Sequence, residues 1–172
     1  IRQQVDRCRV ILDQMSGRAG GAAAELPERI EVAALFADLH GRLPAEQAAR
    51  TRVLGADTLP PIVAPRAGLA QVLLSLVKNA FEATSDPHPV TLEGVQRGDY
   101  VRFIVRDEGP PIPDEVLRRA GEPFYTTKAP GAGFGLGLFL ARMFAERCGG
   151  TLSLQSDHGT TVILELPVSL DG

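Results

Sequence analysis

Long apolar runs are absent from this sequence, and so is a secretion signal. No uninterrupted hydrophobic stretch approaches the roughly 18 residues that a membrane helix needs, and no signal-peptide pattern opens the chain. Cysteine is scarce: 2 among 172 residues, without metal-ligand spacing, are too few for a disulfide scaffold. We therefore expect a globular protein of a reducing, cytoplasmic compartment.

A strong net charge is absent as well. The 18 lysines and arginines against 21 acidic residues leave a net charge of −3 at pH 7. General nucleic-acid binders carry an excess of basic residues, so we expect no nucleic-acid partner. With 44% hydrophobic residues, the chain can bury the core of one ordinary domain with an appendage.

The first residues predict a helix that belongs to a longer protein. Apolar residues at spacings of four, three, four and three form a heptad stripe: Ile1, Val5, Cys8, Leu12 and Met15. Such a stripe suits a helix paired with another helix, or one packed on its own domain. A segment rich in glycine, alanine and proline follows. We divide the chain into a helix fragment at 1–18, a linker at 19–27 and a globular domain at 28–172.

Periodic patterns predict mixed α/β structure in the globular domain. The expected strands lie near 51–54, 61–63, 89–95, 99–106, 151–155 and 160–166, and the expected helices near 66–84, 112–120 and 135–147, after a short strand and helix within 29–39. The helix at 66–84 has the strongest apolar stripe: Leu69, Val72, Leu73, Leu76, Val77 and Ala80. In the last helix we expect an inward face of Leu136, Phe139, Leu140, Met143 and Phe144.

A glycine-rich run leads into that last helix. Gly133, Gly135 and Gly137 alternate with apolar residues. A glycine turn before a helix exposes backbone N–H groups at the positive end of the helix dipole, which suits a polyphosphate. The run lacks the Lys-Ser/Thr ending of a P-loop. Taken alone, it is equally compatible with a hinge or a β-bulge.

Three further motifs stand in order before this run. Asn79, on a polar face of its helix, could give an oxygen to magnesium carried by nucleotide phosphates, or be a plain surface residue. Asp107, which ends a strand two residues before Gly109, could accept a hydrogen bond from an amine such as adenine N6, or only form a turn. The segment 122–128 could be a packed loop, or a lid that brings Lys128 to a phosphate.

The order of these motifs, closed by Gly159-Thr160, closely resembles the ATP-binding domain of sensor histidine kinases. The motifs correspond to the N, G1, F, G2 and final glycine boxes of that family, and the matching element order covers residues 25–168. The resemblance implies a Bergerat-type α/β two-layer sandwich. Its mixed sheet of about five strands packs on three helices, and a dimerisation-helix fragment precedes it.

The same resemblance implies two cofactors, ATP and Mg²⁺, and their contacts. Asn79 would coordinate the metal, Asp107 would bind adenine N6, and Thr160 would support the adenine contact. Gly109 would line the adenine pocket. The phosphates would be held by Lys128 and by the glycine run: Gly133, Gly135, Leu136, Gly137 and Leu138. Asn79 and Lys128 are the expected catalytic residues.

Some positions depart from the commoner family pattern. Ser75 stands where many relatives carry asparagine or another strongly polar group. Pro111 replaces the second glycine of Asp-x-Gly-x-Gly, which removes an N–H and stiffens the start of the lid. Glu82 stands where the commoner N box has a basic residue, as in the nitrogen-regulator type. We expect altered affinity or lid motion from the change at Pro111.

Residues 4–12 resemble the second dimerisation helix of RegB/PrrB-type redox-responsive sensor kinases. In that family a cysteine at the place of Cys8 is a redox switch. The resemblance implies a homodimer through these helices, in which Cys8 could join the two copies, although a small residue at a helical seam is the plain alternative. It also implies a response regulator as partner and a membrane anchor upstream of this cytoplasmic portion.

None of the histidines has the sequence context of the kinases' phosphoryl acceptor, His-Glu-x-x-x-Pro: these are His40, His88 and His158. We therefore expect the donor half of an ATP-dependent protein-histidine kinase, which passes the γ-phosphoryl group to a histidine outside this chain. The alternative is an ATP-gated interaction module, either a degenerate kinase or a clamp-type ATPase, without phosphoryl transfer.

Overall fold

The structure, a computed structural model, describes residues 25–84, 87–128 and 135–168 of the chain. Its main sheet has five strands in the order β2-β4-β5-β7-β6. In chain order these strands are β2 (Thr51–Leu54), β4 (Val90–Arg97), β5 (Tyr100–Arg106), β6 (Thr151–Ser156) and β7 (Thr160–Pro167). The β2–β4 pair is parallel and the other pairs are antiparallel, so the sheet is mixed.

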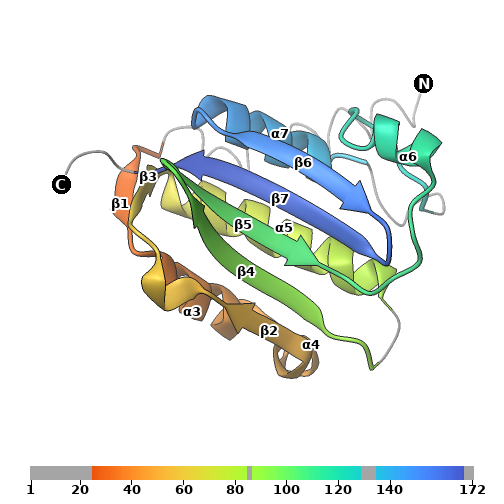
Figure 1. Ribbon diagram of the computed structural model, residues 1–172, viewed down its shortest axis with the longest axis horizontal. Helices are drawn as coiled ribbons and strands as arrows, with labels where there is room; N and C mark the ends of the chain where they lie inside the picture. The colour runs from red at the N-terminus through yellow and green to blue at the C-terminus, as the bar shows by residue number, and fades with distance from the viewer. Residues whose placement is uncertain (1–24, 85–86, 129–134, 169–172) are drawn as a thin grey trace, which may run out of the picture.

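Helices cover one face of this sheet (Figure 1). The longer ones are α3 (Val32–Arg42), α5 (Arg66–Ala83) and α7 (Gly137–Arg147). Shorter helices are α4 (Ala45–Arg50), the 3-10 turn η2 (Ala56–Thr58) and α6 (Asp114–Arg119). The predicted two-layer α/β sandwich, with a mixed five-stranded sheet on three helices, is confirmed.

The predicted stripe of α5 forms the centre of the core. All six of its predicted apolar side chains are buried, as are the four on the inner face of α3, Val32, Leu35, Phe36 and Leu39. Phe36 meets Phe103 of β5 with ring centroids 5.9 Å apart. Strand residues before α5 pair elsewhere: β3 (Ile62–Ala64) and β1 (Glu28–Ile30) form a separate antiparallel two-stranded sheet.

The inward face predicted for α7 is partly wrong. Leu136 is buried and Phe144 packs against the core, as predicted. Met143, however, is 44% exposed, and the buried positions within the helix are Ala141 and Ala145. The two fully buried side chains of α7, a helix that packs against α5, are therefore small.

The end of the linker is anchored to α5. Both carboxylate oxygens of Glu25 accept a hydrogen bond from the N–H of Ala67, at 2.9 and 3.1 Å, and one also accepts from Gly68 at 3.3 Å. Glu25 thus caps a helix whose own N-cap, Pro65, provides no side-chain cap. Most of the linker and the 1–18 helix lie outside the described residues, so the domain division remains a prediction. Among the described residues no helix is both long and apolar enough to cross a membrane.

Candidate nucleotide site

A cavity of about 500 Å³ opens between α5, α6, the start of α7 and the sheet end at β5 and β7. Its lining includes polar groups and glycine backbone: Ser75, Asn79, Glu82, Asp107, Thr126, Thr127, Lys128, Gly135, Gly137 and Thr160. It also includes apolar side chains from the sheet and from the segment through α6: Val105, Ile112, Val116, Leu154 and Val162. A hollow between α3, β2 and α5 measures only about 10 Å³, which is room for a water at most.

Asp107 lies at the buried end of the cavity, directly after β5. Its side chain is 8% exposed, and Oδ1 accepts hydrogen bonds from the N–H groups of Gly109, at 2.9 Å, and Thr160, at 3.2 Å. Burial raises the pKa of this carboxyl above its usual value, although the bonds from Gly109 and Thr160 oppose that rise. Asp107 is thus a fixed acceptor in a site shielded from water.

Glycines allow the chain to close around Asp107. A Cβ on Gly109 would lie 2.5 Å from the carbonyl oxygen of Ala83, at the end of α5. Gly159 has a φ of +106°, and a Cβ there would lie 2.0 Å from the Asp107 carbonyl oxygen. Neither position has room for a side chain. The backbone of Thr160 can therefore form two hydrogen bonds with Asp107. Its N–H donates to Asp107 Oδ1, and its carbonyl accepts from the Asp107 N–H at 2.9 Å.

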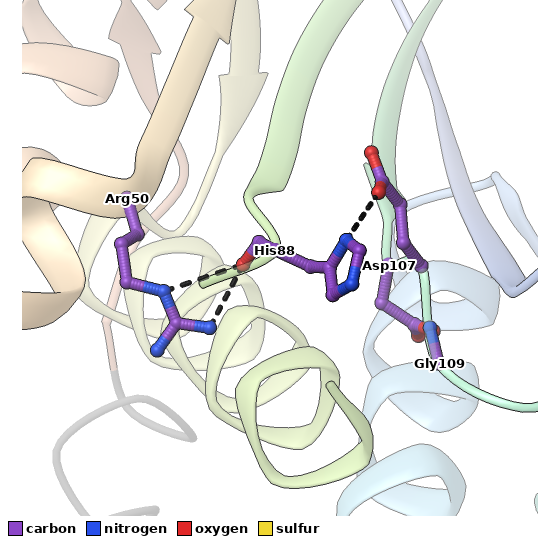
Figure 2. Close-up of polar contacts among 5 residues, drawn as sticks. Arg50, His88, Asp107 and Gly109 are labelled. Atoms are coloured by element: carbon purple, nitrogen blue, oxygen red, sulfur yellow. Dashed lines mark hydrogen bonds and ion pairs between the residues drawn. The ribbon is translucent and has the colours of Figure 1, made fainter. Parts of the chain in front are cut away.

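Figure 2 shows how the loop before β4 supports the residue next to Asp107. His88 Nδ1 lies 2.9 Å from Glu108 Oε2. Arg50 donates to the His88 carbonyl through Nη2 at 2.8 Å and Nε at 3.3 Å, and its guanidinium lies 5.3 Å from the Phe81 ring centroid. The loops before β4 and after β5 are thereby tied together beside the buried end of the cavity.

Asn79 lies on α5, facing the start of α7. A Cβ on Gly137 would lie 3.2 Å from Ser75 Oγ and 3.3 Å from Asn79 Nδ2. A larger residue at Gly137 would press on both side chains. The first N–H groups of α7, beginning at Gly137, thus lie close to Asn79. We predicted the helix to begin at Gly135, but Gly135 has a φ of +67°, which a right-handed helix does not accommodate.

Lys128 extends from the end of the 122–128 segment to α5. Its Nζ forms an ion pair with Glu82 Oε2 and lies 3.4 Å from Asn79 Oδ1. Glu82 also lies near Lys78, with Nζ and Oε1 3.8 Å apart. One ammonium group therefore contacts an amide oxygen and a carboxylate that belong to the same helix.

The two aromatic residues of the 122–128 segment have different environments: Phe124 faces solvent and Tyr125 faces the cavity. Phe124 is 42% exposed and, among the described residues, is the one non-glycine with positive φ, at +66°. Tyr125 lines the cavity, and the guanidinium of Arg119 on α6 lies 4.0 Å from its ring centroid. Arg119 also pairs with Glu122 at 3.1 Å. These contacts hold the Tyr125 ring at the cavity wall.

Most of the predicted site residues thus lie around one cavity. They are Asn79, Asp107, Lys128, Gly135, Leu136, Gly137, Leu138 and Thr160, with Gly109 bonded to Asp107. Gly133 and Cys8 fall outside the described residues. Glu82 and Tyr125 are among the cavity residues that had no predicted role in the site. The spacing did hold a signal for Glu82, because residues three apart share a helix face with Asn79.

The arrangement suits a nucleotide. An acceptor in a dry, apolar-walled end matches a purine base with an exocyclic amine. A helix N-terminus and a lysine at the other end match phosphates. In sequence, residues 64–170 match the family model of histidine kinase-, DNA gyrase B- and HSP90-like ATPases, which is more than half of the chain. The chain belongs to this ATPase family.

Relatives within the family are histidine kinases. Sporulation kinase E of Bacillus subtilis (strain 168) is 36% identical over 116 residues, covering 65% of this chain and 15% of the kinase. Sensor histidine kinase RegB of Cereibacter sphaeroides is 32% identical over 165 residues, covering 89% of this chain and 35% of RegB. The chain therefore spans well under half of each of these two kinases.

A solved structure matches this domain almost end to end. The nucleotide-free catalytic domain of histidine kinase ThkA superposes with a TM-score of 0.71 and 28% identity, covering 82% of this chain and 95% of that domain. The present chain is thus an ATP-binding catalytic domain of the sensor histidine kinase type. The family resemblance drawn from the five motifs is confirmed.

Proposed function

We propose that this domain binds Mg·ATP in the cavity and donates the γ-phosphoryl group to a histidine of a dimerisation domain. The main support for this proposal is the position of two residues. The buried acceptor Asp107 and the cationic Lys128 line a single cavity of about 500 Å³, together with the start of α7. Its volume lies in the range of sites for small ligands.

At the buried end, Asp107 would accept a hydrogen bond from adenine N6. Its Oδ1 already holds two backbone N–H groups, so the carboxylate cannot turn away to meet a base that lacks the amine. The apolar walls from β5, β6 and β7 would stack against the purine. Guanine, which has a carbonyl oxygen in place of that amine, would leave two acceptors facing each other.

At the open end, Lys128 and the first N–H groups of α7 would bind the phosphates. Magnesium, when bound with the nucleotide, supplies charge neutralisation and orientation to the phosphoryl group. The residues present fit such an ion, because a cation, Lys128 Nζ, already lies 3.4 Å from Asn79 Oδ1. Asn79 is the residue that would hold it. The contribution of the chain to catalysis is positioning and charge stabilisation.

The acceptor histidine would come from outside the domain. His40 Nε2 lies 3.0 Å from the Ala48 carbonyl oxygen, and His88 pairs with Glu108. Neither residue lines the cavity, and neither does His158. Donation to a histidine of a separate helix hairpin is compatible with this.

For the whole protein we propose a homodimer through the dimerisation helices and a response regulator as the final acceptor. We also propose redox control with Cys8 as the oxidised residue, on the resemblance of residues 4–12 to redox-responsive sensor kinases; the 32% identity to sensor histidine kinase RegB over 165 residues is compatible with that kinase type. On the same resemblance we propose an upstream membrane anchor, with this domain in the cytoplasm. Disulfide formation at Cys8 is measurable as a reductant-sensitive covalent dimer that Cys8→Ser lacks.

The decisive experiment mixes the chain with a separate hairpin fragment that carries the acceptor histidine, γ-labelled ATP and Mg²⁺. We expect acid-labile, alkali-stable label on the hairpin. Tight ATP binding without label, on a hairpin competent with another kinase domain, would favour the ATP-gated module. Loss of label with Asp107→Asn, at unchanged folding, would assign the donor to this cavity.

A further inference from the structure

The Lys128 ammonium lies where a metal-bound phosphate chain would need a cation. It contacts Asn79 Oδ1 and the Glu82 carboxylate together, at the cavity wall. Asn79 and Glu82 are three residues apart on α5, so their oxygens point to the same side of the helix. The helix thus presents a neutral oxygen and an anionic oxygen to one positive charge.

This pair of oxygens matches magnesium in ligand chemistry. Magnesium takes one or two protein oxygens, carboxylates above all, and keeps waters and phosphates for its other positions. Among residues 25–84, 87–128 and 135–168, no three acidic, histidine or cysteine side chains gather as an all-protein metal site would require. An ion at this pair would therefore take the rest of its coordination from phosphates and waters.

We propose that Asn79 and Glu82 form one cation-binding pair, which Lys128 occupies in the nucleotide-free domain and yields to magnesium when Mg·ATP binds. The proposal rests on the proposed function and adds Glu82 to it, as a second magnesium contact made directly or through a bound water. Lys128 is then free to pair with the phosphates. Binding of magnesium at Asn79 and Glu82 and release of the Lys128 ammonium from them would then be a single exchange of cations.

Charge explains why the exchange requires the metal. The polyphosphate and Glu82 are both anionic, and without a cation between them they repel. Metal-free ATP can take Lys128 only by leaving Glu82 beside the phosphates with no cation nearer than Lys78, whose Nζ lies 3.8 Å from Oε1. Magnesium removes this conflict, because it satisfies Glu82 and the phosphates at the same time. Glu82 therefore penalises ATP without metal and favours ATP with it.

The test compares ATP binding with Mg²⁺ and with EDTA, by calorimetry on the full 172-residue chain. For Glu82→Gln we expect metal-free ATP to bind about fivefold more tightly, the upper range for a partly exposed ion pair. We expect Mg·ATP to bind no more tightly than in wild type. The ratio of the two dissociation constants, which measures the benefit from magnesium, should fall accordingly.

Two further variants sharpen the result. Glu46→Gln removes the same charge from the exposed surface of α4 and should leave the ratio unchanged. In a Lys128→Gln background, Glu82→Gln should improve metal-free binding by a smaller factor, because relief of the charge repulsion remains but no lysine has to leave Glu82. This non-additivity is a readout that a purely structural role of Glu82 would not produce.

The outcomes separate the exchange from the function beneath it. Tighter binding of both forms of ATP by Glu82→Gln would show that Glu82 only holds Lys128 away from the phosphates, and would overturn the shared metal site. Equal loss in both, or no change in either, would also overturn it. If the wild-type chain binds no ATP under either condition, the proposed function itself fails.

Discussion

The backbone N–H of Phe124 donates a hydrogen bond to the carbonyl of Gly135 at 3.1 Å. This bond joins the two ends of the segment that carries Lys128. Both residues have positive φ, +66° at Phe124 and +67° at Gly135. A Cβ on Gly135 would lie 2.4 Å from the Tyr125 carbonyl oxygen. The junction therefore depends on glycine at one end and on a strained phenylalanine at the other.

The strain at Phe124 predicts an unusual order of stability for two truncations. Phe124→Gly should unfold with a free energy about 1 kcal/mol higher than Phe124→Ala, because both lose the ring and only glycine tolerates the positive φ. Met143, similarly exposed at 44% but within α7, is the matched control. There glycine should be the less stable variant by about 1 kcal/mol. Urea unfolding measures all four, and the same order at both sites would contradict the assignment of strain.

Asp107→Asn should separate nucleotide binding from folding. Asparagine can still accept from Gly109 and Thr160 through Oδ1, so the fold should persist. Its amide would place a donor against adenine N6, and we expect ATP affinity to fall about 100-fold or more. Calorimetric titration with ATP measures the affinity, and a thermal melt checks the folding. Undiminished binding would remove Asp107 from the site.

Asn79→Ala should likewise abolish the magnesium-dependent part of ATP binding, which the same titration with Mg²⁺ and with EDTA measures. Undiminished binding would remove Asn79 from the site.

Stability should fall with rising pH because of Asp107. Burial raises the pKa of its carboxyl above the ordinary 3.8, so the folded state holds the proton more tightly than the unfolded state does. The contribution is full below pH 3.8 and is lost as pH rises through the folded pKa. Wild type minus Asp107→Asn, in free energy of unfolding, should decrease across this window. A flat or rising difference would show that the hydrogen bonds outweigh burial.

Glu25→Ala should destabilise the domain by about 1 kcal/mol, since it removes the N-terminal cap of α5 and an anion at the positive end of the helix. Glu28→Ala, three residues later and exposed on β1, should change the free energy of unfolding by no more than about 0.5 kcal/mol. High salt should shrink the Glu25 effect. Equal effects of the two substitutions in chemical denaturation would argue that Glu25 acts through surface charge alone.

Local periodicity predicted the elements whose environment is simple. The α5 stripe is readable because one side of that helix faces the core along its whole length. In α7, hydrophobicity misplaced part of the inner face, since the small Ala141 and Ala145 are buried there and the larger Met143 is exposed. Helix α4 has only 6 residues and no buried side chain, so it leaves no apolar period to detect.

The site was predictable where its residues sit in short motifs. Asn79, Asp107 and Lys128 each stand in such a motif, and the structure places all three on one cavity. The contact of Lys128 with Glu82 joins residues 46 positions apart. No local spacing encodes such a pairing, because it depends on how the segment after α6 crosses α5.

The two ends of the cavity differ in how the chain builds them. Asp107 follows β5 directly and its N–H donates to the carbonyl of Thr160 on the neighbouring strand β7, whereas Lys128 lies on a loop. The contacts to the base thus come from the end of the sheet, and the contact of Lys128 with the phosphates comes from the loop. We therefore expect substitutions within 122–138 to change phosphate binding while the preference for adenine stays intact. In such a domain, phosphate binding can change by substitution in one loop while the nucleotide that it binds remains ATP.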